Sequence, residues 1–175
     1  MDKNVTVIEE RMHYIREKIG YTQKKLADKL GVSRSLINNW ENGFSNISLR
    51  QLIKIAYLYQ VPIDYFLDII SEVDHFDYHF IEEMDLKRIG LKLKEIRKSN
   101  GLTQERFAAM IDTKRSSISY YEIGKMMIST ADLKQICETF GVSADYIVGN
   151  LTENVKRNKK VKLKVKEIKE KVNNE

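Results

Sequence analysis

The sequence predicts an all-α protein built from two tandem copies of a five-helix unit, with a short linker between them and a basic C-terminal tail. Two observations support this fold class. The second half of the chain repeats the first at a constant offset, and the apolar residues within each copy follow helical spacing. No alternating pattern typical of β-strands competes within the repeats.

The repeat needs no gap. Residues 8–68 align with residues 89–149 at an offset of 81, and 19 positions are identical, whereas chance would leave about four. Several other core positions exchange similar side chains, such as Met12 for Leu93 and Trp40 for Tyr121. The identical residues, numbered in the first copy, are Ile8, Ile15, Arg16, Gly20, Thr22, Gln23, Ala27, Arg34, Ser35, Ile37, Glu41, Gly43, Ile47, Ser48, Leu52, Ile55, Val61, Asp64 and Tyr65.

The first helix of each copy is predicted from apolar residues that recur on one face. Thr6 and Glu9 have the spacing of a capping box, which marks the start of the first helix. The apolar face consists of Ile8, Met12, Ile15 and Ile19 in the first copy and of Leu86, Ile89, Leu93 and Ile96 in the second.

A tight turn separates the next two helices. Thr22 and Thr103 follow glycines that can end the preceding helix, and their hydroxyl groups can cap a second helix. Gly31 interrupts this second helix, and Ser33 can cap a third. The third helix is expected to run over residues 33–43 in the first copy and 114–124 in the second.

Two more helices complete the unit. A fourth helix is expected from Ser48, which has capping-box spacing with Gln51, to about Tyr59. A short fifth helix is expected to start at Pro62, since proline is favoured at the first helical position. A unit of roughly 60 residues is large enough to fold by itself.

The composition excludes several classes of protein. A hydrophobic content of 42% supplies a packed core, which excludes disorder throughout. The single cysteine, Cys137, aligns with Ala56 as a small core residue, and no Cys/His cluster has the spacing of a metal site. No apolar run approaches the roughly 18 residues that span a bilayer, and no signal peptide opens the chain. We therefore expect a cytoplasmic protein with no metal site and no membrane partner.

The net charge of +5 is distributed unevenly. Basic and acidic groups number 10 and 8 in residues 1–70, 2 and 6 in 71–88, 9 and 7 in 89–150, and 9 and 4 in 151–175. These limits divide the chain into a first domain, an acidic and aromatic linker, a second domain and a Lys-rich tail. The excess is compatible with a nucleic-acid partner but is too small to indicate one alone.

Two short helices joined by a tight turn are typical of the helix-turn-helix motif. Residues 20–43 resemble the Cro-type (XRE) phage-repressor family, and residues 101–124 resemble it nearly as well. The resemblance covers about residues 8–69 and 89–150, and it implies two lambda-repressor-like helix-turn-helix domains. Two positions depart from the family's pattern: Asp112, where the first turn has Gly31, and Phe44, where many members of the family, and Lys125 in the second copy, supply a base. The residues that carry the resemblance are Thr22, Gln23, Ala27, Ile37, Glu41 and Gly43, with their counterparts 81 positions later.

The family's geometry implies that the N-terminal part of the third helix enters the major groove of double-stranded DNA. Its first, second, third and seventh residues then face the bases. Arginine can form two hydrogen bonds with guanine, and asparagine can form two with adenine. Each such pair favours the matching base over a wrong one by roughly 1–3 kcal/mol. Tyr120 cannot replace the amide of Asn39, so we expect two similar but unequal half-sites. The base-reading candidates are Ser33, Arg34, Ser35 and Asn39, with Lys114, Arg115, Ser116 and Tyr120.

Other motif residues are candidates for contacts with phosphate or for structural roles. The resemblance implies that Gln23 and Gln104 contact phosphate and brace the third helix; plain solvated surface is the alternative. It also implies ion pairs of Arg16 with Glu41 and of Arg97 with Glu122, each 25 residues apart. Trp40, Tyr121, Ile37 and Ile118 are assigned to the core, with stacking on a base as the weaker alternative for the two aromatic residues. Further phosphate candidates are Thr22, Asn42, Thr103 and Lys125.

The linker and the tail leave alternatives open. His75 and His79 could bind a metal, but we favour packing of Phe76, Tyr78 and Phe80 between the two units, which would fix their mutual angle. The tail could be solvated, dock on DNA phosphates or support a homo-oligomer; the linker is a second possible route to self-association.

The leading interpretation is a sequence-specific DNA-binding regulator, most simply a transcriptional repressor that reads two half-sites as an intrachain pseudo-dimer. A DNA-binding accessory protein of a plasmid or mobile element is one alternative, and a protein-interaction module that has lost DNA binding is another. Both copies keep arginine and serine at the start of the third helix, which disfavours the latter. No Gly-rich phosphate loop, metal triad or nucleophile with a nearby base is evident, so neither an enzyme nor a cofactor is expected.

Overall fold

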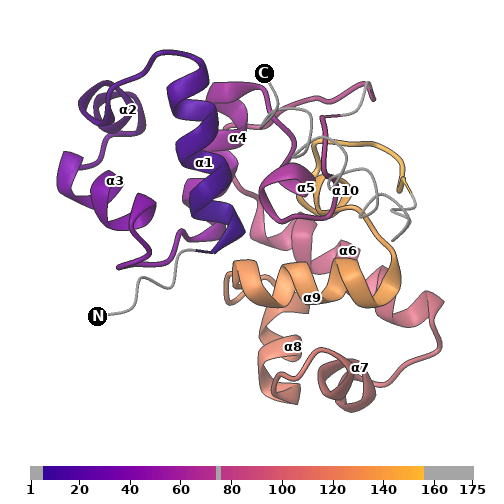
Figure 1. Cartoon of the computed structure of the whole chain (residues 1–175). Coiled ribbons are helices and arrows are strands. Elements are labelled where there is room, and N and C mark those ends of the chain that lie inside the picture. The colour runs from indigo at the N-terminus through magenta and orange to yellow at the C-terminus, as the bar shows by residue number, and fades with distance from the viewer. Residues whose placement is uncertain (1–5, 74–75, 156–175) are drawn as a thin grey trace.

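The computed structural model describes residues 6–73 and 76–155, and within these ranges it contains ten helices and no strand (Figure 1). The all-α prediction is confirmed, with five helices in each copy. The first copy consists of α1 (Val7–Lys18), α2 (Gln23–Leu30), α3 (Arg34–Glu41), α4 (Leu49–Tyr59) and α5 (Ile63–Phe66). The second consists of α6 (Leu86–Ser99), α7 (Gln104–Met110), α8 (Arg115–Glu122), α9 (Thr130–Phe140) and α10 (Ala144–Val148).

Hydroxyl side chains cap several helices where the sequence predicted a start. Thr22 Oγ1 accepts a hydrogen bond from the Lys25 N–H at 3.1 Å, and Ser33 Oγ accepts one from the Leu36 N–H at 3.1 Å. These bonds satisfy backbone donors that the first turn of α2 and of α3 leaves without a helical partner. Thr103 caps α7 in the same way.

Two details of the prediction are wrong. Pro62 directly precedes α5 and does not occupy its first position, so its ring orients the chain as it enters the helix. Ile19 lies beyond the end of α1 and is 44% exposed, because the helix ends at Lys18 before a further turn could bring Ile19 onto the apolar face.

The turn between the second and third helices keeps its conformation in both copies. Gly31 has a φ of 67°, and Asp112 has a φ of 52° at the equivalent position. Aspartate is one of the residues that tolerate this left-handed region, because its short polar side chain can form hydrogen bonds with nearby groups. The substitution of Gly31 by Asp112 therefore leaves the turn intact.

One continuous cluster of buried apolar side chains joins the two copies. Trp40 and Tyr121 are 2% and 6% exposed, and Ile37 and Ile118 are buried with them, which confirms their assignment to the core. Cys137 is also buried, as its alignment with Ala56 predicted.

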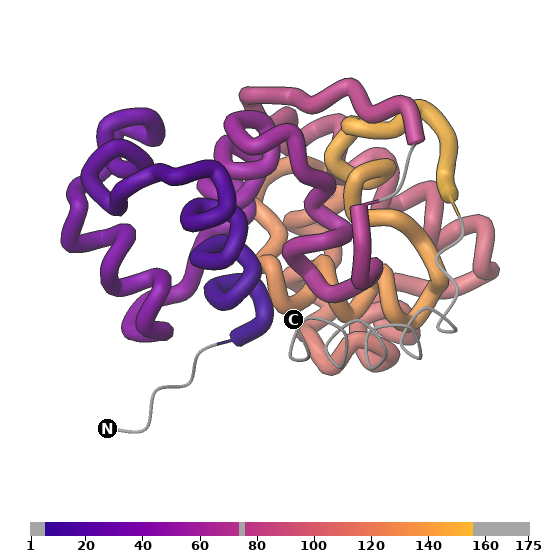
Figure 2. The backbone as a smooth tube through the Cα atoms, turned by 45° about the horizontal axis from the view of Figure 1, so that its top comes forward, coloured from indigo at the N-terminus to yellow at the C-terminus, as the bar shows by residue number. Residues whose placement is uncertain are grey.

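The two copies meet through α5 and α10, which lie side by side (Figures 1 and 2). The carboxylate of Asp64 accepts hydrogen bonds from Ser143 Oγ and from the Ala144 N–H, both at 2.6 Å. In return, Asp145 accepts hydrogen bonds from the backbone N–H groups of Ile63 and Asp64 at 3.0 and 2.8 Å. Because the same residue of each copy binds the other copy, the contact has the reciprocity of a two-fold interface.

The linker packs mainly on the second copy. The His79 N–H donates to the carbonyl of Asn150 at 2.8 Å, and the rings of Tyr78 and Phe80 stack with centroids 5.4 Å apart. Phe76 is 46% exposed, so the expectation that it packs between the two units is wrong. Tyr78, in contrast, packs against the core that the two copies share.

The described ranges contain no helix long and apolar enough to cross a membrane. Across residues 6–73 and 76–155, no three His, Cys, Asp or Glu side chains are grouped as metal ligands would be. His75, one of the two histidines considered as metal ligands and disfavoured, and residues 156–175 of the tail lie outside the described residues.

Candidate nucleic-acid interface

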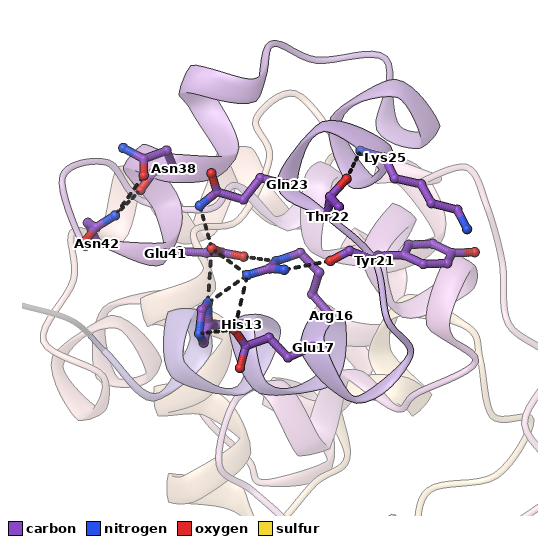
Figure 3. Close-up of polar contacts among 10 residues, drawn as sticks. All are labelled: His13, Arg16, Glu17, Tyr21, Thr22, Gln23, Lys25, Asn38, Glu41 and Asn42. Atoms are coloured by element: carbon purple, nitrogen blue, oxygen red, sulfur yellow. Dashed lines mark hydrogen bonds and ion pairs between the residues drawn. The ribbon is translucent and has the colours of Figure 1, made fainter.

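A buried carboxylate holds the helix-turn-helix of the first copy together (Figure 3). Glu41, at the end of α3, accepts hydrogen bonds from Arg16 of α1, from Nε at 2.5 Å and from Nη2 at 3.1 Å. Gln23, the first residue of α2, donates to the same carboxylate at 2.9 Å. Arg16 also donates to the Tyr21 carbonyl, just before α2, at 2.6 Å. Glu41 therefore joins three helices at one point.

The second copy repeats this network. Arg97 donates to Glu122 from Nε at 2.5 Å and from Nη2 at 2.9 Å, and Gln104 donates to Glu122 at 2.9 Å. Arg97 also donates to the Leu102 carbonyl at 2.8 Å. The structure thus contains both of the ion pairs that the resemblance implied, and each glutamine braces the third helix of its copy.

Both glutamates are ionised despite burial. The side chains of Glu41 and Glu122 are only 3% and 2% exposed. Burial raises the pKa of each glutamate, but hydrogen bonds from the arginine and the glutamine outweigh this effect, so both pKa values lie below the ordinary 4.5. His13 adds a further hydrogen bond to Glu41, which lowers its pKa in the same direction.

The first turn of α3 is open to solvent. Ser33, Arg34 and Ser35 are exposed, and no ion pair engages Arg34 among the described residues. An open depression is lined by Gln23, Arg34, Ser35 and Asn38. Polar side chains and the charged guanidinium group of Arg34 therefore lie together at the position predicted to face DNA bases.

Asn38 also lines this depression, although the sequence analysis did not name it. It is exposed and lies one turn after Arg34, whereas the predicted reader Asn39 is partly buried. Asn42 Nδ2 donates to the Asn38 carbonyl at 2.8 Å and to Asn38 Oδ1 at 3.2 Å. The i, i+4 spacing from Arg34 was the signal that could have identified Asn38.

The corresponding face of the second copy differs in charge. Lys114, Arg115 and Ser116 are exposed at the start of α8, but Arg115 Nε lies 3.8 Å from the Glu105 carboxylate of α7. Lys24 occupies the position of Glu105 in the first copy. The two faces therefore share an exposed arginine, but only in the second copy is a carboxylate recorded beside it among the described residues.

The candidate phosphate contacts and Tyr120 differ in their exposure to solvent. Thr22 and Thr103 are exposed caps at the two helix starts, and Gln23 and Gln104 are partly exposed beside them. Tyr120 is 42% exposed, and the ammonium group of Lys125 lies 5.0 Å from the centre of its ring. Lys125 remains exposed, so its charge is accessible to a phosphate group.

Comparison with known proteins agrees with this geometry. A helix-turn-helix family model matches the chain at residues 12–66 and again at residues 93–147. The transcriptional regulator ImmR of Bacillus subtilis is 36% identical over 58 residues, which cover 33% of this chain and 46% of ImmR. The antitoxin PezA of Streptococcus pneumoniae is 43% identical over 61 residues, 35% of this chain and 39% of PezA.

The control protein C.MunI of a Mycoplasma species is 38% identical over 69 residues, which cover 38% of this chain and 93% of C.MunI. The matched segment spans less than half the length of ImmR and of PezA. No solved structure matches the chain significantly.

Two five-helix units, each with an exposed first turn on its third helix, define a tandem helix-turn-helix protein. The chain belongs to the Cro/C1-type (XRE) helix-turn-helix family, a family of DNA-binding regulators.

The ion pair of the first copy provides a stability test. Arg16→Met leaves the buried Glu41 carboxylate without its cation, and we expect the free energy of unfolding to fall by roughly 3–5 kcal/mol. Urea denaturation followed by circular dichroism measures this change. Arg50→Met, at an exposed position, is the matched control and should change stability by less than about 0.5 kcal/mol. Equal losses in the two variants would contradict a special role for Arg16.

The pH dependence of stability follows from the lowered glutamate pKa values. The stabilising contribution of Glu41 is complete above the ordinary value of 4.5 and is lost as the pH falls below it. We therefore expect the stability difference between the natural protein and Glu41→Gln to be largest near neutral pH and to shrink below about pH 4.5. Urea titrations at several pH values measure this difference. A difference that grows on acidification would contradict the assignment.

Proposed function

We propose that this chain is a sequence-specific, double-stranded DNA-binding transcriptional regulator that reads two major-groove half-sites as an intrachain pseudo-dimer. We call α3 and α8 the reading helices. The observation that carries the proposal is the exposed Arg-Ser pair in the first turn of each reading helix, held by a buried Arg-Glu-Gln network that occurs twice. Two such units related by a reciprocal contact match the symmetry of a duplex with two half-sites.

Each group has a specific task in this proposal. Arg34 and Arg115 read guanine, while Ser33, Ser35, Lys114 and Ser116 contact neighbouring base edges. Asn39, together with Asn38, reads the first half-site at a position where Tyr120 stands in the second. Gln23 and Gln104 bind phosphate from the helix starts, where Thr22 and Thr103 present backbone N–H groups, and Asn42 and Lys125 bind phosphate beside the reading helices.

We expect base reading to need no cofactor, and we place the protein in the cytoplasm. Repression is the simplest regulatory outcome, because a protein bound across two half-sites occludes a promoter.

Selection of binding sites from a random DNA pool, followed by footprinting, tests the proposal. Two related half-sites support it, whereas no enrichment would favour a protein-interaction module. A site confined to a replication or transfer origin would favour an accessory protein of a mobile element.

Removing the arginines tests base reading. Arg34→Ala is expected to weaken binding of the selected DNA by about 1–3 kcal/mol, or roughly 5- to 150-fold, and to relax the preference at one base pair. Arg115→Ala should do the same in the other half-site. Fluorescence anisotropy with single-base variants of the site measures both effects. Lys54→Ala on α4, which removes an equal charge from an exposed position, should leave the base preference unchanged. An unaltered preference in Arg34→Ala would exclude direct reading by that residue.

The contrast between Glu105 and Lys24 predicts unequal half-sites. Glu105→Lys removes the carboxylate beside Arg115, and we expect roughly two- to fivefold tighter binding to DNA carrying the second half-site alone. Lys24→Glu, the reverse exchange, should weaken binding to the first half-site. Affinities for each isolated half-site distinguish the two effects. Similar affinities for the natural protein and Glu105→Lys would show that Glu105 does not restrain Arg115.

A further inference from the structure

The contact between α5 and α10 contains two buried carboxylates, although apolar side chains alone could hold the two copies together. Asp64 and Asp145 are both 0% exposed and lie within the continuous core. Four hydrogen bonds cross between the copies through these two side chains, at 2.6, 2.6, 2.8 and 3.0 Å. Asn150 donates a fifth bond to Asp145 at 2.7 Å, within the second copy.

These carboxylates are costly to bury. Burial raises the pKa of Asp145 above its ordinary value, and the negative charge of Asp64 raises it further, whereas the N–H groups that bind it act in the opposite direction. Apolar contacts are not directional, but hydrogen bonds depend on angle and distance. The two aspartates therefore restrict the orientation of one copy relative to the other in a way that apolar packing alone does not.

Polar contacts connect this interface to the reading helix of the first copy. Arg11 of α1 donates to the Tyr65 carbonyl of α5, to the Ile70 carbonyl at 2.7 Å and to the Asp68 carboxylate at 2.6 Å. The Arg11 guanidinium also lies 4.4 Å from the centre of the Tyr65 ring. From α1, the Arg16 bond to Glu41 reaches the end of α3.

The second copy contains the equivalent connection. Lys92 of α6, 81 positions after Arg11, donates to the Tyr146 hydroxyl of α10 and lies 4.1 Å from the centre of its ring. From α6, the Arg97 bond to Glu122 reaches the end of α8. A continuous series of directional contacts therefore runs from α3 through α1, α5, α10 and α6 to α8. Figure 1 shows α3 and α8 in the parts of their copies that lie away from α5 and α10.

We propose that Asp64 and Asp145 are positioning residues that set the distance and orientation between the reading helices, and thereby restrict the chain to DNA with one spacing between half-sites. The inference deepens the proposed function and rests on it. Two units on a flexible tether would accept many spacings with similar affinity, because only the effective concentration of the second unit would change. A rigid pair binds with both units only when the half-sites are about one helical turn apart, on the same face of the duplex.

A spacing series tests the inference directly. The selected half-sites are joined by spacers that change one base pair at a time over a full helical turn, and affinity is measured for the full-length natural chain. We expect one optimum and at least a tenfold loss of affinity two base pairs away on either side. A flat dependence in the natural chain, within threefold, would overturn the inference without any variant.

The variant Asp64→Asn/Asp145→Asn tests the residues themselves. Asparagine matches aspartate in size, but its NH2 group donates and cannot accept the hydrogen bonds that one of the two carboxylate oxygens accepts. The double variant should bind each isolated half-site as tightly as the natural chain does, while its spacing preference falls below about threefold. Asp77→Asn, which removes one negative charge at an exposed linker position, should retain the natural preference. Retention of the optimum in the double variant would overturn the inference.

A milder variant tests the inference if the double variant does not fold. If circular dichroism shows that the double variant is unfolded, Ser143→Ala removes one bond to Asp64 and keeps both carboxylates. This variant should broaden the spacing optimum, and an unchanged optimum would overturn the inference. The absence of any sequence-selective binding by the natural chain would instead refute the proposed function, and the inference with it. Selective binding that ignores spacing would refute only the inference.

Discussion

The position of each reading helix depends on one buried carboxylate, that of Glu41 or of Glu122. A charge that is only 2–3% exposed is tolerated because an arginine and a glutamine from two other helices donate to it. The same bonds that compensate for burial also fix α1, α2 and α3 relative to one another. The position of α3 and the stability of the unit therefore depend on the same bonds, while the first turn of α3 stays exposed.

The two copies share this skeleton but differ on the surfaces they present. Buried positions such as Arg16 and Glu41 are constrained by geometry on every side, whereas exposed positions are not. Lys24 corresponds to Glu105, and Asn39 corresponds to Tyr120. A dimer of identical chains presents two identical reading surfaces, but a tandem chain does not have this restriction. Covalent duplication therefore permits an asymmetric site while keeping the two-fold arrangement of the fold.

That arrangement depends on the contact between α5 and α10. The apolar core is continuous between the copies, and burial of its apolar surface stabilises their contact. The reciprocal bonds of Asp64 and Asp145 add orientation, since each carboxylate binds donors on the other copy. The linker bonds to Asn150 of the second copy, and its Tyr78, Ile81 and Met84 pack against the shared core.

The sequence alone determined the helices, the repeat and the residues of the motif. Helical spacing, hydroxyl caps and the constant offset are local or periodic signals, so α2, α3 and their counterparts begin where expected. The identity of Asp64 with Asp145 was also visible, but its meaning was not. A buried carboxylate that binds a partner 80 residues away has no local signature, and only the packing of the two copies shows which donors it meets. The same holds for the exposure of Phe76 and of Asn38, because exposure depends on what the rest of the chain covers.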